Sequence, residues 1–371
     1  MLTNYLGLLM LNENEIDIRG LTINRPLASI PIGGRYRIVD FVLSNMINAG
    51  VINIGAFAKS DSRSLTEHLG TGKPWGLDRN TNGLHLYQYS PNGMLMGDVK
   101  MISNNLGFFK KSIQDNVIIS RSNMICKIDY KDAIKGHEES GRDITVIYKK
   151  IANADREMLD GRMLFIDESG LVTGTGINLG SDKDANISME MFLMSKDKFM
   201  EFMSTSMQKG IAESSFEIIY EYMKTNDVNT YEYKGYLKRV DSIYSYFHAN
   251  MDMLDQDVLN ELFYKNGRIY TKVKNDPPTK YSHHADVSNS LISNGCIIDG
   301  KVKNSVLGRQ VIVKKGAFVE NCVILQNCVI EENALLTNVI IDKGGLVKKN
   351  IILKGSTMHP YVIEKNSTID S

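Results

Sequence analysis

Residues 21–50 read LTINRPLASIPIGGRYRIVDFVLSNMINAG, and a short apolar run, LGLLML at residues 6–11, comes shortly before them. When a strand is followed by a tight phosphate-binding turn, the turn usually contains glycines, whose backbone N–H groups bind the phosphate. This chain instead places NENEID, residues 12–17, in the turn, with three carboxylates. Carboxylates repel a triphosphate, and side chains block the close backbone approach that glycine permits. The stretch therefore predicts a phosphate-binding scaffold from which the phosphate loop is missing.

Length, composition and charge limit the class of protein. With 371 residues the chain is too long for one ordinary core, so we expect two domains. Hydrophobic residues make up 43% and charged residues 23%, which excludes a largely disordered chain. The 43 Lys and Arg residues balance the 43 Asp and Glu residues, which disfavours binding to nucleic acid or to a membrane surface. No signal-peptide pattern and no apolar run of about 18 residues occur, so we expect a cytoplasmic protein.

The four cysteines give no sign of a metal site or a disulfide framework. Cys126, Cys296, Cys322 and Cys328 show no CxxC spacing and have no histidine close by in the sequence. Such cysteines are typical of small buried side chains. We therefore predict no metal ligands among them.

From about residue 51 to residue 252, short β-rich runs alternate with helical patterns. VINIGAF (51–57) and NVIIS (116–120) are typical of strands, whereas DFVLSNMINAG (40–50) and MISNNLGFFKKSI (101–113) are typical of helices. This alternation predicts an α/β domain with a mostly parallel sheet, which binds ligands at the carboxyl ends of its strands. We place this domain at residues 1–253 and a linker, which contains two prolines, at residues 254–280.

Beyond residue 281 the apolar period becomes six. One column consists of Val306, Ile312, Phe318, Ile324, Ile330 and Leu336, and a second consists of Cys322, Cys328, Ala334 and Ile340. After Ile340 the phase slips by one residue. A six-residue period is typical of a parallel β-helix, whose coils stack one large and one small side chain inward on each flat face. We therefore predict a β-helix domain at residues 281–371.

The motif IGGRYRIVDFVLSN resembles the segment that follows the nucleotide loop in the glucose-1-phosphate adenylyltransferase (ADP-glucose pyrophosphorylase) family of bacteria and plants. Further similar segments follow in the same order: GKPWGLDR (72–79), KIDY (127–130), ISM (187–189) and YFHANMDML (246–254). The resemblance covers nearly the whole chain. It implies a Rossmann-like nucleotidyltransferase domain, a C-terminal left-handed parallel β-helix of hexapeptide repeats, tetrameric assembly and a role in glycogen synthesis.

The family reaction converts ATP and glucose 1-phosphate into ADP-glucose and pyrophosphate, and it depends on charge neutralisation. The family uses a loop arginine, a lysine, two carboxylates that hold magnesium, and an acidic residue near the sugar. The resemblance aligns these functions with five residues, which we call the degenerate positions: Asp17 for the arginine, Leu27 for the lysine, Asn123 and Arg239 for the two metal carboxylates, and Ser215 for the sugar-binding acid. Arg25 lies two residues before Leu27 and is a weak substitute for the lysine. We therefore assign no catalytic residue, no metal ligand and no cofactor for catalysis.

These losses predict a pseudoenzyme. The chain resembles the non-catalytic D-type subunit of Gram-positive bacteria, which implies a regulatory role beside a catalytic homologous subunit in a hetero- or homotetramer. Arg35 and Arg37 flank Tyr36 and suit a phosphorylated effector, because arginine binds phosphate through two hydrogen bonds. The alternative for Arg37 is an ion pair with Asp40. No nucleic-acid or membrane partner is expected.

Two other functions stay open. One is an active sugar-phosphate nucleotidyltransferase that uses displaced carboxylates such as Asp98 or Asp129, although Asp129 is also a natural helix cap. The other is a hexapeptide acyltransferase, an enzyme class that usually presents a histidine between coils. The histidines of this region are His283, His284 and His359.

Overall fold

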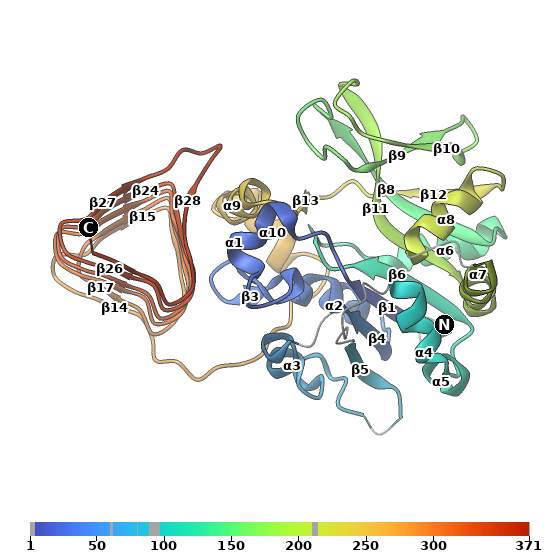
Figure 1. Cartoon of the computed structure of the whole chain (residues 1–371), viewed down its shortest axis with the longest axis horizontal. Coiled ribbons are helices and arrows are strands. Elements are labelled where there is room, and N and C mark those ends of the chain that lie inside the picture. Colours follow the sequence, from blue (N-terminus) through green and yellow to red (C-terminus); the bar gives the residue numbers. More distant parts are fainter. Residues whose placement is uncertain (1–3, 60–61, 80, 89–96, 210–213, 371) are drawn as a thin grey trace. The chain divides into compact units, whose positions relative to one another are not determined.

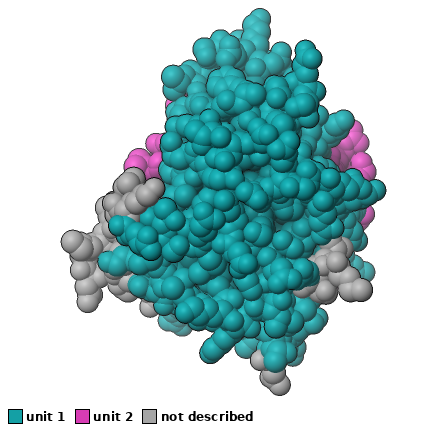
Figure 2. Space-filling view, turned by 90° about the vertical axis from the view of Figure 1, so that its right-hand side faces the viewer, with its two compact units in different colours: residues 1–13, 41–239, 266–270 teal, residues 14–40, 240–265, 271–371 magenta. Residues whose placement is uncertain are grey.

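The structure is a computed structural model, and it describes residues 4–59, 62–79, 81–88, 97–209 and 214–370. Contacts divide the chain into two compact units, coloured separately in Figure 2. Unit 1 comprises residues 1–13, 41–239 and 266–270, and unit 2 comprises residues 14–40, 240–265 and 271–371. The domain boundaries given above stay predictions. Within the stretch 254–280, residues 256–264 form a helix.

A nine-stranded mixed sheet forms the centre of unit 1, in the order β5-β4-β1-β6-β11-β8-β12-β10-β9. Its strands are β1 (Tyr5–Leu11), β4 (Asn53–Ala58), β5 (Gly83–Gln88), β6 (Asn116–Arg121), β8 (Ile144–Ala152), β9 (Arg162–Ile166), β10 (Leu171–Ile177), β11 (Asp184–Ser195) and β12 (Val228–Glu232). β5, β4, β1 and β6 run parallel, as does the pair β8 and β12. β11 is antiparallel to both β6 and β8. The prediction of a mostly parallel sheet was therefore wrong for the second half, because β11 enters between two strands in the opposite direction.

Helices pack on this sheet and close its core. They are α2 (Ile38–Asn48), α3 (Arg63–Leu69), α4 (Asp98–Asn104), α5 (Leu106–Lys111), α6 (Tyr130–Ser140), α7 (Lys196–Lys209) and α8 (Ser215–Met223), with the short 3-10 helix η4 (Lys73–Trp75). β1 is buried along its whole length, as expected of a central strand with helices on both faces. Cys126 is buried, as are the other three cysteines, and none of the four forms a disulfide in the described part of the chain.

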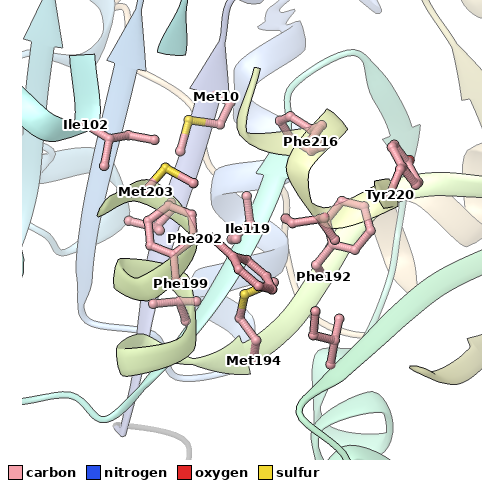
Figure 3. Packing of buried hydrophobic residues seen from close by; sticks show 14 of the residues in the cluster. Met10, Ile102, Ile119, Phe192, Met194, Phe199, Phe202, Met203, Phe216 and Tyr220 are labelled. Carbon is pink, nitrogen blue, oxygen red and sulfur yellow. The ribbon is translucent and has the colours of Figure 1, made fainter. Parts of the chain in front are cut away.

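Figure 3 shows the main core of unit 1, in which α7 and α8 pack against β11. Its labelled members are Met10, Ile102, Ile119, Phe192, Met194, Phe199, Phe202, Met203, Phe216 and Tyr220. Burial of each large apolar side chain contributes about 1.5–3 kcal/mol. Met10, Met194 and Met203 therefore fill gaps in the core.

Unit 2 contains a left-handed parallel β-helix built from three sheets, which Figure 1 shows as the three sides of a triangle. The first sheet contains β14 (Lys280–Tyr281), β17 (Ile297–Ile298), β20 (Ile312–Val313), β23 (Val329–Ile330), β26 (Leu346–Val347) and β29 (Thr368–Ile369). The second contains β15 (Asp286–Ser288), β18 (Lys301–Lys303), β21 (Phe318–Glu320), β24 (Leu335–Thr337) and β27 (Ile352–Lys354). The third contains β16 (Leu291–Ile292), β19 (Val306–Leu307), β22 (Val323–Ile324), β25 (Val339–Ile341) and β28 (Tyr361–Ile363).

The coils in the middle of the β-helix have 17 residues, because each contains two six-residue sides and one five-residue side. Val302 pairs with Val319, and Val319 pairs with Leu336. The predicted large column is confirmed at Ile324, Ile330 and Leu336, which are fully buried. Before Ile324 the predicted column was wrong by one residue, because the side between Val319 and Ile324 has five residues and not six. The inward residues there are Leu307, Val313 and Val319. The prediction had named their neighbours Val306, Ile312 and Phe318.

The small inward column contains Cys322, Cys328 and Ala334, as predicted, and then Val339 in place of Ile340. Corners of the six-residue sides also have left-handed residues, such as Asn327 and Asn333, three residues after an inward residue. Both slips occur at corners where an asparagine comes only two residues after an inward residue, namely Asn304, Asn321 and Asn338. Their φ angles are 46°, 50° and 52°, a left-handed conformation that asparagine tolerates better than most residues. Each such corner tightens one turn of the coil.

The first half of the segment 21–50 also belongs to unit 2. This part contains η2 (Ile16–Ile18), α1 (Arg19–Thr22), η3 (Leu27–Ser29), β2 (Pro31–Ile32) and β3 (Tyr36–Arg37), and the same unit holds α9 (Ile243–Asp252) and α10 (Gln256–Tyr264). Gly33 and Gly34 have φ angles of +57° and +76°, and the Gly33 N–H donates to Asn250 Oδ1 (3.0 Å). A Cβ at Gly34 would lie 2.6 Å from Ser293 Oγ. Close approach to the β-helix therefore requires glycine at this turn.

Among the described residues, no helix has the length and apolar character needed to cross a membrane.

Candidate functional site

The turn after β1 is held by its own carboxylates. Glu13 is only 6% exposed, and its Oε1 accepts hydrogen bonds from the backbone N (2.8 Å) and Oγ (2.6 Å) of Ser122, just after β6. Burial raises the pKa of Glu13, against the lowering effect of these hydrogen bonds and of Arg121. The carboxyl ends of the parallel strands β1 and β6 are thus joined by a side chain, in the region where a phosphate loop would lie.

The next carboxylates of the turn lie in unit 2. Glu15 Oε1 accepts a hydrogen bond from the backbone N–H of Leu27 (2.7 Å), and Leu27 is fully buried. Asp17 is exposed in η2. Arg25 is held elsewhere, because its guanidinium donates to Asp342 Oδ2 of the β-helix at 2.5 Å. The structure therefore gives Arg25 a structural partner, which argues against a role as a substitute for the missing lysine.

A half-buried arginine, Arg121, ends β6. Arg121 Nε lies 2.9 Å from Glu190 Oε2, and its guanidinium lies 4.4 Å from the centre of the Phe216 ring. Burial lowers the pKa of Arg121, but Glu190, Glu13 and Asp98 outweigh this effect and raise it. Glu190 reaches this position from a β-bulge in β11, with φ at +53°. Sequence reasoning missed this cluster, since its members are far apart in the chain.

Ser215, the degenerate position for the sugar-binding acid, is completely buried at the start of α8. Its backbone N–H and its Oγ donate to Asp98 Oδ1 (2.7 Å) and Oδ2 (2.6 Å), which joins α8 to α4. Burial raises the pKa of Asp98, and the hydrogen bonds from Ser215 oppose this shift. Asp98 therefore acts as an internal anchor. Asp129 caps α6, accepting from the Lys131 N–H (3.0 Å).

The two degenerate metal positions lie side by side. β13 (Leu237–Arg239) pairs antiparallel with β7 (Met124–Cys126), with Arg239 opposite Met124 and hence next to Asn123. The Arg239 guanidinium donates to the carbonyl of Leu159, and Asn123 Oδ1 is buried without a hydrogen-bond partner among the described residues. Magnesium prefers carboxylate oxygens, whereas this pair offers one neutral amide and one cation. These two positions do not fit the metal that the family uses.

A cavity of about 210 Å³ lies beside this pair. It is lined by three acidic residues, Asp160, Glu190 and Glu217, and by Arg162, Arg239 and Tyr220, among others. Arg162 forms an ion pair with Glu217, and its guanidinium lies 4.6 Å from the centre of the Tyr220 ring. Arg239 and Glu217 belong to sequence motifs that the family uses for metal and sugar. The charged groups of the cavity therefore neutralise one another, at positions where the family binds charged substrates.

Arg37 belongs to a cluster of cations in unit 2, which we call the basic cluster: Arg25, Arg37, Lys274 and Lys343. Burial, together with the charges of Arg37 and Arg25, lowers the pKa of Lys343 to about 7, against the opposing effect of Asp342. Burial and the charge of Arg309 likewise lower the pKa of Lys274. These cations face two carboxylates, Asp342 and Asp276, and Arg309 adds a further positive charge near Lys274, so the cluster has a surplus of cations and favours an anion. Sequence reasoning missed both lysines, because they lie in the linker and in the repeats.

The two arginines predicted to bind an effector differ in their surroundings. Arg35 is exposed, and its guanidinium lies 5.3 Å from the centre of the Tyr36 ring, which stacks on Phe263 (5.0 Å). Arg37 is half-buried, and its backbone N–H donates to Asp40 Oδ2 (2.9 Å). Asp40 therefore contacts Arg37 through the main chain, as a helix cap would.

The three histidines near the β-helix lie in different settings. His284 Nδ1 is 3.1 Å from Asp299 Oδ1, beside a cavity of about 430 Å³ that Lys301, Lys315 and Glu332 also line. His283 and His359 are exposed. The pair of His284 and Asp299 is thus the part of the β-helix closest in character to an acyltransferase site.

Comparison with known proteins agrees with this geometry. Residues 18–158 match the nucleotidyl transferase family model, and residues 277–370 match the model for a GlmU-like C-terminal hexapeptide region. The glycogen biosynthesis protein GlgD of Bacillus subtilis is 32% identical over 318 residues, covering 84% of this chain and 81% of that protein. GlgD of Geobacillus stearothermophilus is 34% identical, with 80% and 77% covered, and the glucose-1-phosphate adenylyltransferase of Thermomicrobium roseum is 30% identical, with 82% and 76% covered.

The fold is thus that of a nucleotidyltransferase domain joined to a hexapeptide β-helix. The chain belongs to the glucose-1-phosphate adenylyltransferase family, which includes the GlgD proteins.

Proposed function

We propose that this protein is a catalytically inactive, regulatory subunit of glucose-1-phosphate adenylyltransferase, which modulates a catalytic homologue in cytoplasmic glycogen biosynthesis. The observation that carries the proposal is that Asn123 and Arg239, brought close by the pairing of β7 with β13, stand where the family has two metal carboxylates. The assignment to glycogen biosynthesis is supported by the similarity to two GlgD proteins, which are named glycogen biosynthesis proteins.

The energetics favour inactivity. Removal of one contact that stabilises transition-state charge costs about 3–4 kcal/mol, or a rate factor of roughly 10²–10³. Here the metal pair, the lysine at Leu27 and the phosphate loop are altered together, and such losses are coupled and not simply additive. In place of these groups, Glu13, Arg121 and Glu190 form internal contacts. A nucleoside triphosphate bound there would have to break the internal contacts without gaining a magnesium ion.

The proposed ligand of the subunit is a phosphorylated effector, held by Arg35 and Arg37 together with the rest of the basic cluster. Arginine forks bind phosphate oxygens in pairs, and a half-buried lysine adds a strong point charge. Arg37 contributes from the cluster itself, while Arg35 contributes from the exposed side of β3. Replacement of Arg37 by alanine should therefore weaken effector binding more than replacement of Arg35.

The proposed partner is a catalytic homologous subunit, in a hetero- or homotetramer. Regulation requires two states of the assembly, and an effector must bind them with different affinity. A subunit that carries an effector site but no reactive centre can shift such an equilibrium. The adenylyltransferase of Thermomicrobium roseum aligns over 82% of this chain, which supports a shared architecture for the two kinds of subunit.

The test is ADP-glucose formation by the purified chain, by a catalytic homologue and by the mixture, each with and without a phosphorylated effector. We expect no turnover from the chain alone and a changed rate or effector response in the mixture. Turnover by the chain alone at a rate close to that of the homologue, abolished by Asp98→Ala or Asp129→Ala, would establish the active alternative. An unchanged rate and effector response on mixing would refute the regulatory role.

A further inference from the structure

A groove of about 560 Å³ lies in unit 1, at the edge of the nine-stranded sheet where β4 and β5 begin. Side chains from these strands form one wall, and the junction of α4 and α5 forms the other. Asn123 follows β6, Arg239 ends β13 and Ser215 begins α8, whereas this groove is lined from the amino ends of β4 and β5 and contains none of these residues. It is therefore separate from the site described above.

The base of the groove is a network of neutral polar groups centred on Gln114. Asn53 Nδ2 donates to Gln114 Oε1 (3.1 Å), Ser112 Oγ donates to the same oxygen (2.7 Å), and Gln114 Nε2 donates to Asn82 Oδ1 (3.4 Å). Asn53 is only 4% exposed, and its Oδ1 has no hydrogen-bond partner among the described residues. A buried amide oxygen without a partner is costly, so it favours a ligand that donates a hydrogen bond.

Aromatic rings form the wall of the groove. The Phe108 ring centre lies 5.3 Å from that of His85 and 5.6 Å from that of Tyr87, and Tyr87 stacks on Phe57 at 5.0 Å. Gly55 pairs with His85, and a Cβ at Gly55 would lie 2.7 Å from Phe108. Glycine inside the strand thus lets Phe108 lie close against the sheet. His85 is exposed, so part of this aromatic wall is open to solvent.

We propose that this groove binds a neutral carbohydrate. A pyranose has hydroxyls that donate to Asn53 Oδ1 and accept from amides, and an apolar C–H face that packs against the electron-rich face of an aromatic ring. No carboxylate occurs among the described lining residues, and Lys111 is the cation nearest the rim. Amides and rings with little charge suit a sugar better than a phosphorylated ligand. The inference does not depend on the proposed regulatory function.

The test uses the full chain and isothermal titration calorimetry with glucose, maltoheptaose and cellohexaose as probes. Variants His85→Ala and Tyr87→Leu remove rings from the wall, and Lys110→Ala, which lies outside the groove, is the matched control. We expect saturable binding of at least one probe, weakened about tenfold or more by each ring variant and unchanged by the control. Thermal unfolding of each variant checks that the fold is retained.

Because His85 is exposed, we expect His85→Ala to fold normally. This variant therefore still tests the proposal if Tyr87→Leu is unstable. Failure of all three sugars to bind overturns the proposal, as does binding that His85→Ala leaves unchanged. Adenosine is titrated in parallel, because a nucleobase also stacks on aromatic rings. Tighter binding of adenosine than of every sugar, with loss in His85→Ala, would assign the groove to a nucleoside and overturn the carbohydrate assignment.

Discussion

The guanidinium of Arg25 and the carboxylate of Asp342 meet at 2.5 Å although they lie 317 residues apart in the sequence, and their side chains are only 2% and 4% exposed. The pair ties the segment before β2 to the β-helix of unit 2. Burial of two charges is tolerated here because each neutralises the other.

Loss of one partner of this pair should destabilise unit 2. Arg25→Ala leaves the Asp342 carboxylate buried and without its main counter-charge, so we expect the free energy of unfolding to fall by about 3–5 kcal/mol. Chemical denaturation followed by circular dichroism measures the effect. Arg63→Ala is the control, because Arg63 pairs with Glu67 on an exposed helix. An equal loss in both variants would contradict the structural role of Arg25.

Restoration of the two metal carboxylates should restore metal binding before it restores catalysis. The double variant Asn123→Asp, Arg239→Asp places one carboxylate just before β7 and the other at the end of β13, which pairs with β7, and we expect it to bind Mn²⁺ detectably. ADP-glucose formation should stay absent, since Leu27 and the turn after β1 are unchanged. Electron paramagnetic resonance of Mn²⁺ measures the binding, with Asn123→Asp alone as control. Equally strong binding by the unmodified chain would contradict our interpretation of Arg239.

Anion binding by the basic cluster should depend on pH. Because burial holds the pKa of Lys343 near 7, this lysine loses its charge as the pH rises from about 7 to 9, and a bound anion favours the protonated form. We expect the affinity for pyrophosphate to fall over this range, with proton uptake on binding. Calorimetry in buffers of different ionisation enthalpy measures both.

Lys343→Met should weaken pyrophosphate binding near pH 7 and remove most of this pH dependence, whereas Lys354→Met on the exposed surface of the β-helix should change neither. The lowered pKa of Lys343 also makes the stability of the fold depend on pH. A lysine pKa lowered by folding costs stability fully below pH 7, and the cost decreases as the pH rises toward the unfolded value of 10.5. The unmodified chain should therefore gain stability relative to Lys343→Met between pH 7 and pH 10.

The left-handed corners of the β-helix should tolerate glycine but not alanine. At Asn321, with φ at +50°, alanine brings a steric penalty without the local hydrogen bonds of an amide, so Asn321→Ala should cost about 1–2 kcal/mol. Asn321→Gly should lower the free energy of unfolding by less than about 1 kcal/mol, because glycine adopts this conformation freely. Denaturant unfolding compares both with Lys354→Ala, an exposed residue of β27 outside the corners. Equal costs for alanine and glycine would rule out the backbone as the cause.

Much of the architecture could be predicted from the sequence, because hydrophobic periods are local. The six-residue period revealed the β-helix, and Ile324, Ile330 and Leu336 were placed correctly in its interior. The slip of one residue after Ile340 was predicted, but the earlier five-residue side between Val319 and Ile324 was not, since a fixed period of six was assumed before that point. The signal was present in the asparagines, Asn304, Asn321 and Asn338, which recur every 17 residues.

The site was predictable only in part. The resemblance aligned Asn123 and Arg239 with two metal ligands, and the pairing of β7 with β13 brings these residues together. The internal contacts that replace the missing groups were not predicted. Glu13 was taken as a repulsive group facing a phosphate, whereas it binds Ser122 from a neighbouring strand. Such partners depend on the order of strands in the sheet, which local patterns do not specify.

The 17-residue coil also determines how this protein can change in length. Insertion of one residue within a strand would turn the later side chains of that strand toward the opposite face, whereas removal of a whole coil would leave the remaining strands in register. The last coil illustrates the rule. Ile341 and its partner Ile363 lie 22 positions apart in the sequence, and the extra residues form a loop between β27 and β28, outside the strands. Among relatives, the domain should therefore differ by complete coils or by loops at its corners.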